Sequence, residues 1–272
     1  GKLVITKDGI KETSLIKEGV SKNEETSLAI AEISDMYGEK LKEVISHSDY
    51  DLSIYDENGI RMVRSREVGI GNFVADAYRL STGADIATCN GGGIRADIDI
   101  GDVTYEEIIA VNPYGNTLCV VEVTGQEILD MLEFFYRSME SEYKKDGKVV
   151  VEDGSFQQVS GIKFTVDTSI ESSVVLSEEG SLLSVGEARR ISDVMILQGY
   201  DYVPIDLEQT YRLASHNYMI KNGGSGMLYF LKDHKLVIDE ALSDYQVLIN
   251  YLDMLGGDLS QYAKADDRII IK

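Results

Sequence analysis

Apolar positions recur at two different spacings along this chain of 272 residues. Over residues 22–46 they recur every three or four positions behind a Ser-x-x-Glu pattern at Ser21, which predicts one long amphipathic helix. Short apolar or alternating runs elsewhere predict strands. The other predicted helices cover residues 72–81, 104–111, 125–141 and 242–255. The predicted strands cover residues 3–6, 84–89, 117–123, 157–167, 192–198, 210–217 and 268–271.

These elements lack the regular strand–helix alternation of a doubly wound sheet. Strands and helices are mixed in irregular order, which favours an α+β fold. The charged segment 142–154 interrupts the pattern and is expected to be a solvated excursion.

Composition narrows the classes of partner. The chain carries 47 acidic and 26 basic side chains, a formal charge of −21, which argues against nucleic-acid and anionic membrane surfaces. An anionic ligand must therefore be held by a local group of cations. No apolar run approaches the ~18 residues of a membrane span, so no membrane segment is expected. Gly1 is not a natural first residue, and we expect the sequence to be part of a longer protein.

Cysteine and histidine give no sign of a metal or redox centre. Cys89 and Cys119 fall inside apolar runs, where a buried small hydrophobe is expected instead of a disulfide or a nucleophile. His47, His216 and His234 are scattered, and none belongs to a metal-binding pattern. A two-metal centre needs several convergent His and carboxylate ligands, so no metal site is expected in this chain.

A glycine turn, Asn90-Gly91-Gly92-Gly93-Ile94-Arg95, follows the predicted strand 84–89. Three glycines leave backbone N–H groups uncovered and can adopt positive φ. Such a turn at a strand's carboxyl end suits a small polar ligand. Asn90 could donate to and accept from a sugar hydroxyl or a base edge, and Arg95 could bind an anion. The alternative is a tight connection in which Arg95 is a solvated charge.

A second candidate loop contains three arginines before the helix at 72–81. Arg66 could present its planar guanidinium to a phosphate or carboxylate. The alternative is a salt bridge on a very acidic surface, and Arg61 and Arg64 are interpreted as such surface charges.

Two further loops each present a tyrosine beside glycine. Tyr114 lies in Asn-Pro-Tyr-Gly-Asn, where proline and glycine make a rigid corner. Tyr218 precedes the glycine loop at residues 222–227. The two rings could hold a planar base between their faces, each face contributing about 1 to 3 kcal/mol. A turn-capping role is the alternative for Tyr114.

Four segments, taken together and in order, resemble the C-terminal domain of the bacterial and animal 5′-nucleotidase family. They are NGGGIRADI, TYEEIIAVNPYGNTLCVVEVTGQEIL, FQQVSGIKFTVD and YRLASHNYMIKNGGSGM. SREVGIGNFVADA and the predicted long helix are similar to the start of that domain and to its interdomain helix. The family includes UDP-sugar hydrolases and 2′,3′-cyclic-nucleotide phosphodiesterases. The resemblance extends from about Ser21 to Lys272.

The resemblance implies that the chain has three segments and that substrate binding and hydrolysis belong to different domains. It implies a four-layer α/β/β/α substrate-binding domain over 47–272, an interdomain helix over 21–46, and over 1–20 the residual tail of an N-terminal metallophosphatase domain. In the family that absent domain holds two divalent metal ions of zinc or manganese type and hydrolyses the phosphoester. The chain alone is therefore expected to be inactive and to contribute no catalytic or metal residue. An extracytoplasmic location, periplasmic, secreted or at the cell surface, is implied as well.

The resemblance also implies which residues meet the nucleotide or nucleoside. The matching positions are Arg66, Asn90, Gly92, Arg95, Tyr114, Tyr218 and Ser225. Two other classes of function remain open: a stand-alone nucleoside- or nucleotide-binding module without a catalytic partner, and a degenerate domain retained for dimerisation or cell-wall display. Whether the reading frame upstream encodes a metal-binding Gly-Asn-His motif separates the first of these from a parent phosphohydrolase.

The chain departs from the family at the last glycine loop. Ser225 stands where the family usually has an Asp that contacts ribose hydroxyls, which leaves open how ribose is recognised. Four residues, instead of the usual three, separate Tyr218 from Gly223, so the angle of its ring could differ. Both stacking positions hold Tyr instead of the common Phe, which preserves the stacking face.

Overall fold

The computed structural model describes residues 2–7, 9–14, 21, 23–142 and 144–272, and the chain divides into two compact units, Gly1–Glu43 and Val44–Lys272. The first unit contains an antiparallel hairpin of β1 (Lys2–Thr6) and β2 (Gly9–Ser14), then helix α1 (Glu24–Leu41).

Helix α1 is shorter than predicted, and its cap is a different residue. Residue 22 lies outside the described residues, and Asn23 is the cap: its Oδ1 accepts from the Thr26 backbone N–H at 2.8 Å. The helix ends at Leu41 because Val44–Ser48 forms strand β3, which pairs with β5 (Gly101–Thr104). The apolar positions at 44 and 45 therefore belong to a strand.

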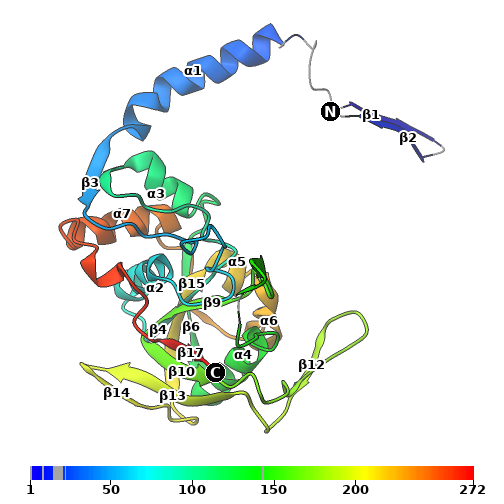
Figure 1. Ribbon diagram of the computed structural model, residues 1–272, viewed down its shortest axis with the longest axis vertical. Coiled ribbons are helices and arrows are strands. Elements are labelled where there is room, and N and C mark those ends of the chain that lie inside the picture. The colour runs from blue at the N-terminus through cyan, green and yellow to red at the C-terminus, as the bar shows by residue number, and fades with distance from the viewer. Residues whose placement is uncertain (1, 8, 15–20, 22, 143) are drawn as a thin grey trace. The chain divides into compact units, whose positions relative to one another are not determined.

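A five-stranded sheet forms the centre of the second unit (Figure 1). Its order is β16 (Leu236–Ile238), β6 (Leu118–Thr124), β15 (Thr210–His216), β4 (Ile86–Asn90) and β9 (Gln157–Ser160). Strand β15 runs antiparallel to β6 and parallel to β4. The carboxyl ends of β4 and β15 therefore lie on the same edge of the sheet, and both lead into predicted ligand loops.

Helices cover one face of this sheet. They are α2 (Gly69–Thr82), α3 (Tyr105–Val111) and α7 (Asp244–Met254). Strand β6 shows why both faces are buried: Leu118 and Val120 belong to the core shared with these helices, whereas Cys119 and Val121 belong to the core on the opposite face.

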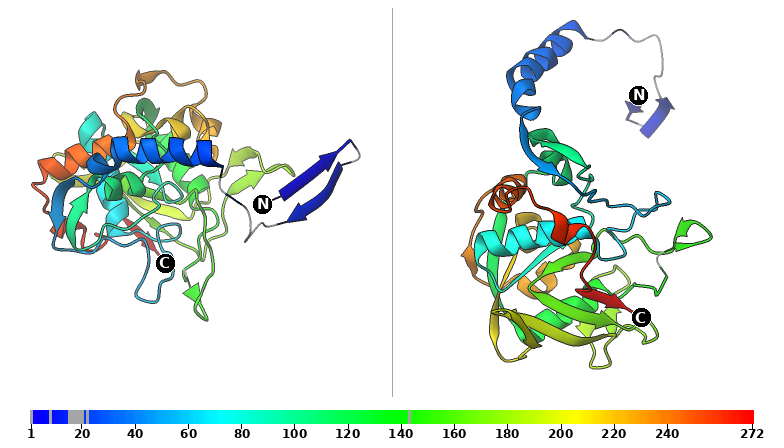
Figure 2. Two further views of the ribbon diagram at one scale, coloured as in Figure 1. Left: turned by 90° about the horizontal axis from the view of Figure 1, so that it is seen from above. Right: turned by 60° about the vertical axis from the view of Figure 1, so that its left-hand side comes forward.

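The opposite core is completed by α4 (Gly125–Phe135) and by a second sheet (Figures 1 and 2). Its strand order is β14 (Asp201–Pro204), β13 (Ile191–Gln198), β10 (Ile162–Val166) and β17 (Ile269–Ile271). The shorter elements are β7 (Lys144–Lys145), β8 (Lys148–Val149), β11 (Val174–Leu176), β12 (Leu182–Val185), α5 (Asn217–Ile220) and α6 (Leu228–Leu231).

The segment predicted as one strand over 157–167 is two strands, β9 and β10, which belong to different sheets. Gly161 separates them with a φ of +75°. A Cβ atom there would lie 2.1 Å from the Asp85 carbonyl oxygen, so only glycine fits this junction.

Helix α4 also ends earlier than predicted, at Phe135 instead of residue 141. The Arg190 guanidinium explains this end, because its Nη1 atom donates to the carbonyls of Tyr136, Arg137 and Met139 at 3.2, 2.7 and 3.3 Å. These carbonyls are satisfied by a side chain and not by further helical turns. The expectation for cysteine is confirmed: Cys89 and Cys119 are free and buried.

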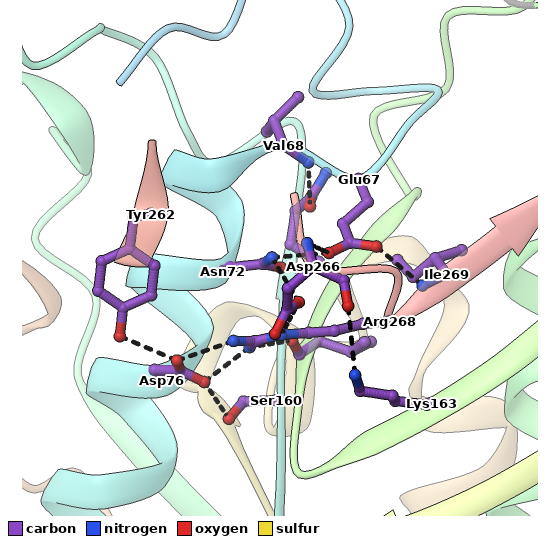
Figure 3. Close-up of polar contacts among 12 residues, drawn as sticks. Glu67, Val68, Asn72, Asp76, Ser160, Lys163, Tyr262, Asp266, Arg268 and Ile269 are labelled. Atoms are coloured by element: carbon purple, nitrogen blue, oxygen red, sulfur yellow. Dashed lines mark hydrogen bonds and ion pairs between the residues drawn. The ribbon is translucent and has the colours of Figure 1, made fainter. Parts of the chain in front are cut away.

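A buried ion pair joins α2 to the C-terminal strand (Figure 3). The Arg268 guanidinium meets the Asp76 carboxylate through two parallel contacts of 2.7 and 2.9 Å. Tyr262 donates its hydroxyl to the same carboxylate at 2.9 Å. Because the pair is bidentate and largely shielded from water, it is far stronger than a surface salt bridge.

Glu67 extends this connection to the loop before α2 (Figure 3). Its carboxylate accepts the backbone N–H groups of Asp266 and Ile269 at 3.0 and 2.9 Å. Burial raises the pKa of Glu67 above its ordinary value, while these hydrogen bonds oppose the shift. The loop over residues 61–68, which contains the arginines, is thereby attached to the C-terminal segment.

Candidate functional site

A cavity of about 710 Å³ lies where the turn after β4 meets loops from other parts of the second unit. The described residues that line it are Arg64, Asn90, Gly92, Gly93, Arg95, Tyr114, Asn116, Asp153, Gly154, Ser155, His216, Tyr218 and Ser225. Six of the seven substrate-binding positions predicted from the sequence are among them, and Arg66 is not.

The glycine turn is shaped by close packing. A Cβ atom on Gly91 would lie 2.1 Å from the Val63 carbonyl oxygen, and one on Gly92 would lie 2.9 Å from the Gly154 carbonyl oxygen. None of the three glycines has a positive φ. The turn therefore requires glycine because other backbone segments approach it, and not because of its own conformation.

Asn90 connects three of the lining segments. Its Nδ2 donates to the Gly154 carbonyl at 3.0 Å, and its Oδ1 lies 3.1 Å from His216 Nε2. Burial lowers the pKa of His216 to about 4, so the ring is neutral near pH 7 and Nε2 bears the proton given to Asn90. Both ends of the Asn90 amide thus hold the cavity wall together, and one N–H and one lone pair remain available.

Three guanidinium groups gather beside the cavity. Arg64 and Arg95 line it, and Arg61 lies close enough that burial, followed by the charges of those two, lowers its pKa. One carboxylate, that of Glu152, lies 3.1 Å from Arg64 Nη1 and 3.5 Å from Arg61 Nη1. The Asp153 carboxylate lines the cavity as well. Three guanidinium groups against two carboxylates still leave a local excess of positive charge within a chain of formal charge −21.

Arg66 does not line the cavity. Its Nη2 atom donates to the backbone carbonyls of Glu140 and Ser141 at 2.8 and 2.7 Å. Its side chain thus holds the segment after α4, and Arg64, two residues earlier, reaches the cavity. Anion binding by Arg66 stays a prediction from the resemblance.

The two tyrosines that line the cavity are exposed, Tyr114 at 61% and Tyr218 at 45% of their surface. Tyr114 is carried on the corner before Gly115, whose φ is +63°. The ring of Tyr218 lies on Gly224, where a Cβ atom would come within 2.2 Å of its Cε1 atom. A side chain at position 224 would therefore displace the ring.

Ser225 lies in the same glycine loop with φ +58° and ψ +14°. A residue other than glycine in this left-handed region costs about 1 to 2 kcal/mol. The surrounding loop therefore holds Ser225 in place beside the cavity, in the position where the resemblance expects a ribose-binding Asp.

Sequence reasoning missed part of this wall. Asp153 and Gly154 belong to the segment 142–154 that was expected to be a solvated excursion, and Ser155 follows it directly. The Asp153 carboxylate orders this part of the wall by accepting the Ser155 N–H at 2.8 Å. Asn116 and His216 were missed as well, although each lies within two residues of a predicted stacking tyrosine. That proximity in sequence was the signal available for finding them.

The described residues do not fit a metal centre. Among residues 2–7, 9–14, 21, 23–142 and 144–272, no group of three or more His, Cys, Asp or Glu side chains converges in a way that could hold an ion. The same part of the chain contains no helix with the length and apolar character needed to cross a bilayer.

Residues 44–232 match the family described as "5′-nucleotidase, C-terminal domain", and the chain belongs to this family. The α/β/β/α architecture expected from the resemblance is thereby confirmed, together with the resemblance itself.

Three relatives illustrate the match. The trifunctional nucleotide phosphoesterase protein YfkN of Bacillus subtilis is 30% identical over 259 residues, covering 93% of this chain and 16% of the relative. A 5′-nucleotidase of Vibrio cholerae is 28% identical, covering 84% of this chain and 34% of the relative. The solved structure of a 5′-nucleotidase precursor from Thermus thermophilus superposes with a TM-score of 0.68 at 30% identity, covering 90% of this chain and 42% of that one. The chain thus spans less than half the length of each.

Proposed function

We propose that this chain is the nucleotide-recognition domain of a 5′-nucleotidase-family phosphohydrolase. The observation that carries the proposal is the composition of the cavity: it combines guanidinium groups with two exposed aromatic rings in a chain that is otherwise strongly acidic. A nucleotide consists of an anionic phosphate and a flat base, and these are the two chemistries that such a wall recognises.

In this proposal each set of side chains has one task. Arg64 and Arg95 bind the phosphate with charge-assisted hydrogen bonds, supported by the neighbouring charge of Arg61. Tyr114 and Tyr218 stack on the two faces of the base. Their exposure supports this assignment, because a ring that only fills the core would be covered by other side chains.

In this proposal the chain contributes to hydrolysis by positioning the nucleotide. The described residues do not fit a two-metal centre, so hydrolysis of the phosphoester belongs in this proposal to a metal-bearing domain elsewhere in the full-length protein. This chain contributes binding energy that holds the base and directs the phosphate, which is how remote binding groups accelerate a reaction. Relatives such as the "Cell wall protein Lmo0130" of Listeria monocytogenes support an extracytoplasmic location.

The tyrosine pair provides the test of base recognition. Tyr114→Ala and Tyr218→Ala are each expected to weaken adenosine binding by about 1 to 3 kcal/mol, whereas Tyr→Phe at either position costs little because the stacking face survives. Calorimetric titration measures the affinities.

Tyr229→Ala is a matched control, because Tyr229 is also 45% exposed and does not belong to the cavity wall. Melting temperatures of all variants are recorded in parallel, and the two cavity variants should stay close to the wild type. Undiminished adenosine affinity with both alanines present would refute base stacking. A large loss of thermal stability would instead assign the tyrosines to packing.

A further inference from the structure

Asn116 and Tyr114 both line the cavity and lie two residues apart in the chain. If a base stacks on Tyr114, as proposed above, the Asn116 amide is the neighbouring group that could meet its edge. Its Nδ2 atom lies 3.2 Å from Asp244 Oδ2. Its Oδ1 atom has no hydrogen-bond donor among the described residues and is not buried. Which end of this amide points into the cavity decides whether the site offers an acceptor or a donor to the base.

Asp244 decides that orientation. It is completely buried at the start of α7, and its backbone N–H donates to the Asn116 carbonyl at 2.8 Å. Its Oδ1 atom accepts the Tyr245 N–H at 2.9 Å, and its Oδ2 atom accepts from Asn116. The Asn112 side chain is a further hydrogen-bonding neighbour of this carboxylate. An ionised carboxylate can only accept hydrogen bonds, so it must face the NH₂ end of the amide. The carbonyl end of Asn116 is then directed away from Asp244.

We propose that Asp244 is a positioning residue that fixes the Asn116 amide with its oxygen toward the cavity, and that the site therefore prefers bases bearing an exocyclic amino group. Adenine and cytosine carry such a donor at the edge where hypoxanthine and uracil carry an oxygen. The inference rests on the proposed function, because it concerns the base of the same bound nucleotide.

Protonation of Asp244 should relax this preference. Burial raises its pKa to about 6, so the group is ionised at pH 7.5 and largely protonated at pH 5. A protonated carboxyl can donate to the Asn116 oxygen and allow the amide to turn. The titratable groups that face Asp244 are Tyr78 on α2 and Cys89 on β4, and burial raises the pKa of both, that of Cys89 to about 12. Both stay neutral over this range.

The Asp244→Asn variant gives a sharp test because it is isosteric and introduces one donor. The oxygen of the new amide is retained by the Tyr245 N–H, so its NH₂ group must face Asn116 and turn the Asn116 oxygen away from the cavity. At pH 7.5 the wild-type chain is expected to bind adenosine about tenfold more tightly than inosine. Asp244→Asn should bind inosine at least as tightly as adenosine.

Asp253→Asn is the matched control, since it removes the same charge from an exposed position on the same helix and should keep the wild-type ratio. Between pH 7.5 and pH 5 the adenosine-to-inosine ratio should fall for the wild type and stay constant for Asp244→Asn. If Asp244→Asn has the same adenosine-to-inosine ratio as the wild type at pH 7.5, the role of Asp244 is overturned and the proposed function stays intact. The same holds if the wild type binds both nucleosides equally. A wild type that binds neither nucleoside would overturn both.

Discussion

His216 shows how one buried side chain links the site to stability. It is neutral in the folded chain because burial lowers its pKa to about 4, and its proton on Nε2 orients Asn90. The unfolded chain binds a proton to the same ring near pH 6.5. The unfolded state is therefore favoured as pH falls below 6.5, and the stability that depends on a neutral His216 is lost progressively toward pH 4.

We therefore expect the wild type to lose about 2 kcal/mol more than His216→Gln between pH 7.5 and pH 5, measured by urea unfolding. Asp244 acts in the opposite direction, because its raised pKa makes the folded state bind a proton first as pH falls through about 6. The comparison of His216 with His216→Gln is therefore repeated in chains that also carry Asp244→Asn, which removes that opposing contribution. Identical pH profiles for the chain with and without His216 would show that the histidine is protonated as easily when folded.

Single residues were also where sequence reasoning reached its limit. The glycine turn, Tyr114 and Tyr218 were located from local patterns because turns and glycine loops are determined over a few positions, whereas Ser225 was located from the family resemblance. The sequence favoured Arg66 as the anion ligand and interpreted Arg64 as a surface charge, whereas Arg64 lines the cavity. The two arginines lie two residues apart in the same kind of segment, so local patterns did not distinguish their positions. Which guanidinium faces the cavity depends on the carbonyls after α4 that bind Arg66, and that contact is distant in sequence.

At the scale of elements, the Asp76–Arg268 pair connects α2 to the strand that ends the chain (Figure 3). Removing one partner of a buried pair leaves the other charge without compensation. Asp76→Ala is expected to lower the free energy of unfolding by about 3 to 5 kcal/mol, as measured by chemical denaturation.

Asp201→Ala is the comparison for that variant, because Asp201 is exposed on β14 and its loss should change stability by no more than about 0.5 kcal/mol. If Asp76→Ala lowered the free energy of unfolding no more than Asp201→Ala does, the Asp76–Arg268 pair would not hold α2 against the C-terminal strand.

Element type was predictable where the periodicity was strong, but several element ends were not. Helices α2, α3 and α7 lie close to their predicted spans. Helices α1 and α4 end early because distant partners intervene, strand β5 in the first case and Arg190 in the second. The apolar spacing continues past both ends, so no local pattern could have marked them.

At the scale of the whole molecule, a chain of formal charge −21 presents a small group of arginines at its cavity. Such a chain repels anions in general and attracts one only where that group outweighs the surrounding field. The parallel strands β4 and β15 bring the glycine turn and the Tyr218 loop to one edge of the sheet. Arg95 from the turn and Tyr218 from the loop therefore line the same cavity. The interdomain role of the segment before residue 47 stays a prediction.

The central claim is that the phosphate of a nucleotide is bound by the cavity arginines. Three variants isolate that contribution: Arg64→Gln removes a cavity guanidinium, Arg66→Gln removes the neighbour that binds backbone carbonyls, and Lys235→Gln removes an equal charge from an exposed position. If only Arg64→Gln lowers the affinity for AMP, Arg64 is identified as a phosphate ligand.

The most direct measurement is a calorimetric titration of the wild type and these variants with AMP and with adenosine at low and high salt. The wild type should bind AMP at least about tenfold more tightly than adenosine at low salt, and the difference should shrink as salt is added. Arg64→Gln should remove most of the difference while leaving adenosine affinity unchanged, and Lys235→Gln should preserve it. Equal affinities of the wild type for AMP and adenosine at low salt would contradict the account.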